Sequence, residues 1–124
     1  MTECDNYSRD TISVMRGDTA MLDLTILNGA SDSVYFLKEN DRVIFTVAYR
    51  GEAVIRKSYK QPDQDSAGVI RIRLAPEDTF DLNFYRGVYD VRLETGDEVM
   101  TVIMPSVFVM IPGAASRSGK GKEL

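Results

Sequence analysis

Residues 85–103 constrain the fold of this chain more than any other segment, because apolar and charged side chains alternate along the first part of it. Tyr89, Val91 and Leu93 are apolar, and the residues between them and directly after them are charged. This period of two is typical of a β-strand with one buried face. The Gly96-Asp97 pair then forms a turn before a second apolar run. The segment therefore predicts a β-hairpin, and no residue in it indicates catalysis.

The rest of the chain repeats this pattern, with glycine, proline, asparagine and aspartate at the breaks. Turn residues recur about every 8–12 positions, and no helical pattern of about 10–15 residues separates the apolar segments. We therefore predict an all-β fold, an antiparallel β-sandwich of immunoglobulin-like or related type with about eight strands. The predicted strands are residues 11–15, 19–27, 42–49, 53–59, 68–74, 87–95, 98–104 and 106–111.

One segment, residues 76–81, differs from the strands. Pro76 is followed by acidic residues, and this order suits the first turn of a helix. Proline's missing N–H is harmless there, and carboxylates meet the positive end of the helix dipole. We predict one short helical turn at this point, with Phe80 and either Leu82 or Phe84 closing one end of the sandwich.

The chain has 124 residues, which is enough for one domain with a hydrophobic core. We predict a flexible leader at residues 1–9, a β-sandwich domain at 10–112 and a disordered tail at 113–124, where small and charged residues predominate. The alternating strands also predict the core. Its expected members are Leu22, Leu24, Ile26, Val43, Phe45, Val47, Ile70, Ile72, Leu74, Tyr89, Val91, Leu93 and Val109.

The composition excludes most catalytic chemistry. The chain has no histidine, which removes the commonest general base and zinc ligand, and its single cysteine, Cys4, excludes an intrachain disulfide. The carboxylates lie mostly in turn sequences, where aspartate hydrogen-bonds its own backbone. We therefore predict no enzymatic activity, no cofactor and no metal.

Two short motifs have simpler structural explanations. Arg16-Gly17-Asp18 matches the tripeptide of integrin ligands, but it leads directly into a strand and predicts a tight turn with the glycine at positive φ. Asp63-Gln64-Asp65 has the spacing of some calcium loops, but it lacks the glycine and the distant glutamate of such a loop. We interpret both motifs as turns.

Charge and hydropathy restrict the partners. The net charge is −4, whereas nucleic-acid binding requires a basic surface. No apolar run reaches the roughly 18 residues of a membrane helix. The first residues also lack the basic and apolar regions of a secretory signal. We therefore predict a chain without a signal peptide that binds neither nucleic acid nor membrane.

The last two predicted strands are apolar on both faces, which is unusual for a strand that faces water on one side. One of these faces needs cover, either from the segment 80–84 of the same chain or from another chain, and the residues leave both possibilities open. Cover by a second copy predicts a homo-oligomer. The predicted interface residues are Met100, Val102, Met104, Phe108 and Met110.

The tyrosines suggest a second class of function. The chain has six of them and no tryptophan, and exposed tyrosines can form a platform for a sugar. Tyrosines at strand ends are more often half-buried, with a hydrated hydroxyl group. A carbohydrate-binding or adhesin-like module is therefore the alternative hypothesis, and tyrosines gathered in an exposed cleft would favour it.

A series of motifs in a fixed order carries a family resemblance over about residues 10–111. It begins with Arg16-Gly17-Asp18-Thr19 and Asp41-x-Val43-x-Phe45-Thr46-Val47, and continues with Gly68-x-Ile70-x-Ile72-x-Leu74 and Pro76-Glu77-Asp78-Thr79. It ends with Gly87-x-Tyr89-Asp90-Val91, Thr101-Val102-Ile103 and Phe108-Val109. With these motifs in this order, the chain resembles small β modules from the tail and baseplate regions of phages and prophages of Gram-positive bacteria. It is similar to the N-terminal domain of phage baseplate upper proteins.

The resemblance implies a structural protein with no enzymatic activity and no cofactor. It implies other virion or tail proteins as partners, bound through protein–protein assembly. Such a protein would be found in the bacterial cytoplasm during assembly and then in the virion. The expected function is therefore a structural and interaction protein of a phage or prophage tail or baseplate.

Overall fold

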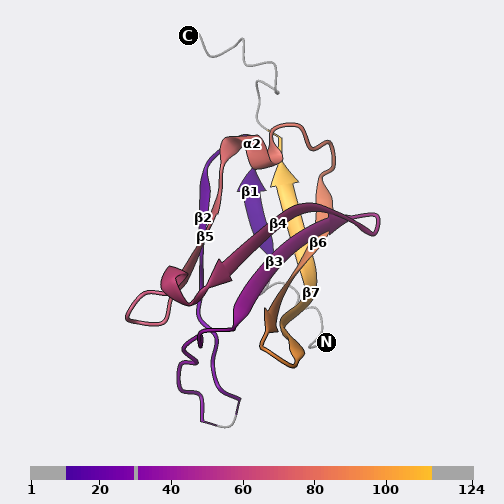
Figure 1. Cartoon of the computed structure of the whole chain (residues 1–124). Helices are drawn as coiled ribbons and strands as arrows, with labels where there is room; N and C mark the ends of the chain where they lie inside the picture. The colour runs from indigo at the N-terminus through magenta and orange to yellow at the C-terminus, as the bar shows by residue number, and fades with distance from the viewer. Residues whose placement is uncertain (1–10, 30, 113–124) are drawn as a thin grey trace.

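The computed structural model of the chain describes residues 11–29 and 31–112, and these residues form two β-sheets (Figure 1). The predicted leader at residues 1–9 and tail at 113–124 lie outside the described residues. The seven strands are β1 (Ile12–Met15), β2 (Ala20–Leu24), β3 (Arg42–Tyr49), β4 (Glu52–Lys60), β5 (Ile70–Leu74), β6 (Arg86–Glu94) and β7 (Val99–Ile111). Two short helical turns are η1 (Gln61–Asp63) and α2 (Pro76–Thr79). Within the described ranges, no helix is long and apolar enough to cross a membrane.

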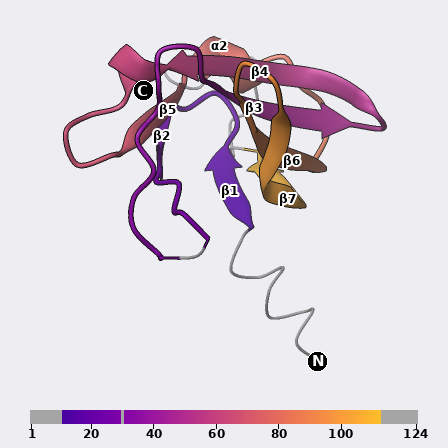
Figure 2. The same cartoon turned by 60° about the horizontal axis from the view of Figure 1, so that its bottom comes forward.

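The larger sheet has five strands in the order β1-β7-β6-β3-β4, and the smaller sheet pairs β2 with β5. The five-stranded sheet curls, and its concave side faces the two-stranded sheet (Figure 2). All strand pairs are antiparallel except β1 and β7, which run parallel. The chain passes from β1 directly into the smaller sheet and returns at its end to lie beside β1 (Figure 1).

The all-β class is confirmed, but the expected strand count and the wholly antiparallel arrangement are wrong. Residues 98–104 and 106–111, expected as two strands, form the single strand β7, which continues through Pro105. Pro105 is tolerated because it lies where β1 does not pair with β7 and where the register with β6 shifts. A proline costs least at such an edge or bulge, since the sheet does not need its N–H there.

The core lies between the concave side of the large sheet and the inner side of the small one. The predicted core residues are buried there, with two exceptions: Leu22 is half-buried, and Val109 is buried on the convex side, opposite Arg86. Aromatic rings occupy the middle, where the Tyr89 ring centroid lies 5.8 Å from that of Phe45 and 6.5 Å from that of Phe108. The core also contains residues outside the predicted list, namely Val14, Leu37, Ile55, Phe108 and Met110, together with Phe84, which was expected as one of two alternatives for closing the end of the sandwich.

The predicted helical turn begins at Pro76 as expected and closes one end of the fold (Figure 1). The Thr79 hydroxyl accepts a hydrogen bond of 2.8 Å from the Gly17 N–H, which joins α2 to the turn between β1 and β2. Gly17 has a φ of 84°, as predicted for this turn. Phe84 is buried and stacks on Tyr49 at 4.6 Å, whereas Phe80 is exposed, so Phe84 is the plug.

Asp78 ties α2 to the large sheet. Its Oδ2 accepts a hydrogen bond of 2.7 Å from the Ala75 N–H and lies 2.8 Å from Nζ of Lys57 on β4. Burial raises the pKa of Asp78, but the Lys57 hydrogen bond, the Ala75 amide and the charges of Lys57 and Arg73 together lower it below its ordinary value. The folded carboxyl group therefore binds a proton less readily than the unfolded one.

This pKa shift predicts a pH-dependent contribution to stability. A carboxylate with a lowered pKa stabilises the fold at pH values above its unfolded pKa of 3.8, and the contribution is lost as the pH falls through the folded pKa. We expect Asp78→Asn to lower the free energy of unfolding by about 1 kcal/mol at neutral pH. The difference between the thermal melts of the two proteins should begin to shrink below about pH 4 and should disappear once the pH is below the folded pKa of Asp78. Asp81→Asn, at an exposed carboxylate, is the control and should change little; a difference independent of pH would contradict the role of the charge.

Candidate functional site

The first half of β7 forms an apolar strand edge that the described chain leaves uncovered. β6 pairs along one edge of this 13-residue strand, but β1 pairs with the other edge only at residues 108–111. The strand contains no charged residue. Val99 is 60% exposed, Met100 43% and Met104 72%. Unpaired backbone groups flanked by exposed apolar side chains are a template for pairing with another chain.

The structure divides the predicted interface residues into two groups. Met100 and Met104 are exposed and Val102 is half-buried, so these three lie along the uncovered half of β7. The prediction that Phe108 and Met110 are interface residues is wrong, because both side chains are 0% exposed and lie in the core. The prediction failed because register shifts between β6 and β7 interrupt the alternation, so residues of one parity do not share a face along the whole strand.

These positions also bear on how the apolar faces of β7 are covered. For Phe108 and Met110 the cover is internal, since both pack in the core of their own chain. For the first half of β7, among residues 11–29 and 31–112, no strand lies along the free edge. Cover of this half by another chain therefore stays a prediction.

An apolar groove of about 360 Å³ lies beside this edge. Ile12, Leu22 and Ile103, from β1, β2 and β7, form part of its lining, and the buried core residues Phe45 and Val91 form its floor. β1 and β2 belong to different sheets and are not paired with each other. The groove therefore marks the place where the two sheets do not close around the core.

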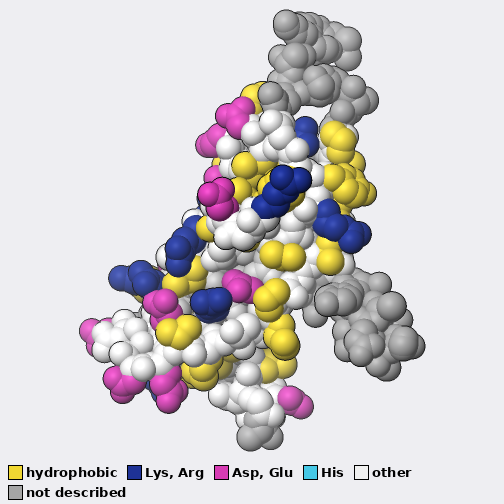
Figure 3. All heavy atoms as spheres, turned by 90° about the vertical axis from the view of Figure 1, so that its right-hand side faces the viewer, with side chains coloured by type: hydrophobic (Ala, Val, Ile, Leu, Met, Phe, Trp, Pro, Cys, Tyr) yellow, Lys and Arg dark blue, Asp and Glu magenta, His cyan; other side chains and the backbone are white. Residues whose placement is uncertain are grey.

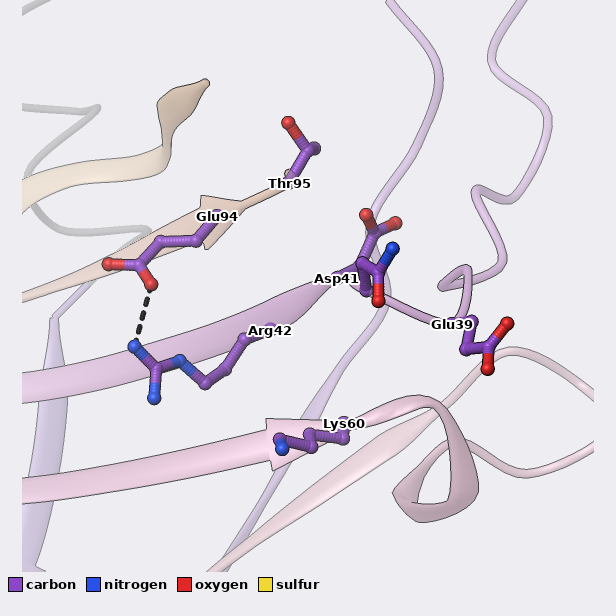
Figure 4. Close-up of a pocket in the computed structure, with 7 residues that line it drawn as sticks. Glu39, Asp41, Arg42, Lys60, Glu94 and Thr95 are labelled. Atoms are coloured by element: carbon purple, nitrogen blue, oxygen red, sulfur yellow. Dashed lines mark hydrogen bonds and ion pairs between the residues drawn. The ribbon is translucent and has the colours of Figure 1, made fainter. Parts of the chain in front are cut away.

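A polar pocket of about 270 Å³ lies at one end of the large sheet (Figure 4). The Arg42 guanidinium on β3 donates a hydrogen bond of 2.8 Å to the Glu94 carboxylate on the adjacent strand β6. Lys60 lies on β4, the other neighbour of β3, and Glu39 lies in the loop before β3. These side chains offer carboxylate, ammonium and guanidinium groups to a polar ligand. The described residues contain no group of three or more cysteine, aspartate or glutamate side chains placed to hold a metal ion.

A second polar pocket of about 470 Å³ adjoins the first and includes Tyr35 and Asp97. The Tyr35 hydroxyl donates a hydrogen bond of 2.5 Å to Oδ2 of Asp41, which also accepts one of 3.0 Å from the Lys38 N–H. The Asp41 hydrogen bond, burial and the Asp41 charge raise the pKa of Tyr35 to about 12. Asp41 is buried, and through these two hydrogen bonds it holds the loop before β3.

The tyrosines do not gather in one cleft within the described residues. Tyr89 is buried, Tyr49 stacks on Phe84, and the exposed Tyr85 follows α2. Tyr35 alone lines one of the polar pockets described above. Tyr7 lies outside the described residues. The arrangement therefore does not form the tyrosine platform that would favour a sugar site.

The Asp63-Gln64-Asp65 motif forms a turn, as its sequence predicted. Asp63 accepts a hydrogen bond of 2.8 Å from the Lys60 N–H, and Asp65 accepts two of 2.9 Å from the Ala67 and Val69 amides. The Val69 amide is the main cause of the lowered pKa of Asp65, and Ala67, Arg71 and Gly68 add to it against the effect of burial. These carboxylates satisfy the backbone of their own loop.

No protein-family model matches this chain, and neither does any curated protein. The resemblance to phage tail and baseplate modules therefore stays a prediction that rests on its motifs. The uncovered half of β7 and its exposed methionines are consequently the basis for assigning a function.

Proposed function

We propose that this chain is a non-enzymatic structural and interaction protein of a phage or prophage tail or baseplate, and that it acts through protein–protein assembly. The observation that supports assembly is the uncovered, uncharged first half of β7. The tail or baseplate context rests on the motif resemblance alone, whereas the proposed immunoglobulin-like or related sandwich rests on the alternating strands and the spacing of the turns. Other virion proteins and further copies of the chain are its proposed partners.

Strand addition at β7 would satisfy two physical requirements at once. It would supply hydrogen-bond partners to the backbone groups that no described strand pairs, and it would remove the exposed side chains of Val99 and Met104 from water. A second copy is a suitable partner, because antiparallel pairing of two identical uncharged edges places no like charges opposite each other. Pro105 limits the available edge to the residues before it, since it has no N–H to donate.

The test is the mass of the protein by light scattering over a concentration series. We expect the wild type to self-associate and Met104→Glu to weaken association by about tenfold or more, because pairing would bury an unpaired carboxylate. Leu27→Glu, at a 53% exposed apolar residue outside the strands, is the matched control and should associate like the wild type. A monomeric mass for the wild type at every concentration would remove self-association from the proposal.

A carbohydrate-binding module is the alternative, and the paired polar pockets are the one observation that favours it. Glu39, Asn40 and Thr95 line both pockets and could hydrogen-bond sugar hydroxyl groups. The dispersed tyrosines weigh against this alternative. Titration with neutral oligosaccharides, followed by backbone NMR, separates the two functions, because only a sugar-binding module would show shifts confined to these pockets.

A further inference from the structure

The outward surface of the five-stranded sheet, here called the convex face, carries a net positive charge, whereas the chain as a whole carries a net negative charge. Residues that lie opposite each other on neighbouring strands point to the same side of a sheet. The register therefore places three rows on the convex face: Lys60, Arg42 and Glu94; Ser58, Ile44 and Arg92; and Arg56, Thr46 and Asp90. Arg86 joins them beside Val109.

The charged side chains of these rows, with Arg86, are five cations and two carboxylates, a net charge of +3. The whole chain carries −4, so the remainder carries −7. Both carboxylates of the convex face already have partners, because Glu94 pairs with Arg42 at 2.8 Å and Asp90 with Arg92 at 3.5 Å. Arg56, Arg86 and Lys60 have no carboxylate partner within the described part of the chain.

Apolar side chains lie among these cations. Val88 is exposed on the same face and stands opposite Val107 on one side and Ala48 on the other. Ile44 lies between Ser58 and Arg92 and is buried although it points outward, in keeping with long arginine side chains covering apolar surface. Figure 3 shows the side of the molecule where β6 and β7 lie, with basic side chains set among hydrophobic ones.

We propose that the convex face binds an acidic protein surface, with carboxylates that meet Arg56 and Arg86 around an apolar centre at Val88. Arginine is enriched and lysine depleted in protein interfaces, and four of the five cations here are arginines. Complementary charge directs and orients association, and the local excess of positive charge on an acidic protein selects a negative partner. The inference rests on the proposed function only in that the chain acts by binding another protein.

The test uses a random copolymer of glutamate and tyrosine as the probe, with binding measured by calorimetry at low salt. We expect the wild type to bind it and Arg56→Glu/Arg86→Glu to lose at least about tenfold in affinity. Arg56→Lys/Arg86→Lys, which keeps the charge, should retain most of the binding. The matched control is Arg71→Glu/Arg73→Glu on β5, which makes the same charge change on the outward side of the other sheet and should leave affinity within about twofold.

Three results would overturn the inference. An equal loss in both double glutamate variants would show that net charge alone determines binding. Equal binding of a DNA duplex, lost in the same variants, would show a general polyanion surface. A change from oligomer to monomer in Arg56→Glu/Arg86→Glu would show that a second copy occupies the face. Met104→Glu should bind the copolymer normally, so failure of the proposed assembly at β7 and failure of this inference are distinguishable.

Discussion

Phe45→Ala should lower the free energy of unfolding by about 3–5 kcal/mol, the largest effect that we expect from a single substitution in this chain. Phe45 lies in the middle of β3 with 1% of its surface exposed, and its cross-strand neighbour Val91 on β6 is also buried. Removing the ring would leave a cavity against Tyr89 that strands held by hydrogen bonds on both sides cannot close. Chemical denaturation measures the loss directly.

Phe36→Ala is the matched control, because it removes the same ring from an exposed position outside the strands. We expect it to cost less than about 1 kcal/mol, as for most surface substitutions. A loss under about 1 kcal/mol for Phe45→Ala itself would mean that this face of β3 does not pack against the core.

β3 and β6 show why much of the core was predictable from the sequence. Both strands lie inside the large sheet, with one face in the core, so burial requires an apolar residue at every second position. Val43, Phe45 and Val47 follow that period without interruption. In such strands the alternation of apolar residues nearly matches the alternation of buried residues. Ile44 is the exception, because it is buried on the convex face, where its cover depends on side chains from the neighbouring strands.

β7 shows where this reasoning fails. Its register with β6 shifts twice, and each irregularity changes which residues face the core. Phe108 and Met110 consequently lie in the core, although they have the same parity as the exposed Met104. The parallel pairing of β1 with β7 was also unpredictable, because periodicity shows that a strand exists but not which strand lies beside it or in which direction.

Some features of the candidate sites could likewise be predicted from the sequence, and others could not. Exposure of Met100 and Met104 could be predicted, since a strand with two apolar faces cannot bury both against one core. The polar pockets were missed, because they combine a loop before β3 with the hairpin between β6 and β7. The charge of the convex face was also missed, since it depends on the pairing of β3 with both β4 and β6.

Gly87→Ala should lower the free energy of unfolding by about 1–3 kcal/mol, because the new methyl group has no room. A Cβ at this position would lie 2.7 Å from the backbone oxygen of Ala48 and 3.0 Å from the ring of Phe84. The Ala48 oxygen belongs to β3, which pairs with both β4 and β6, so it cannot move without disturbing both pairs. The neighbouring Phe84 ring is held by its stacking on Tyr49.

Gly96→Ala is the control for Gly87→Ala, because no atom lies within 4 Å of the Cβ that it would add. Thermal unfolding of the two variants should therefore differ although the chemical change is the same. If Gly87→Ala unfolds like Gly96→Ala, the close approach of β6 to β3 and to the Phe84 plug is looser than this packing requires. If Gly87→Ala is destabilised and Gly96→Ala is not, packing requires glycine at the first position of the Gly87-x-Tyr89-Asp90-Val91 motif. The glycine of this motif is then explained by the lack of space for a side chain in the fold.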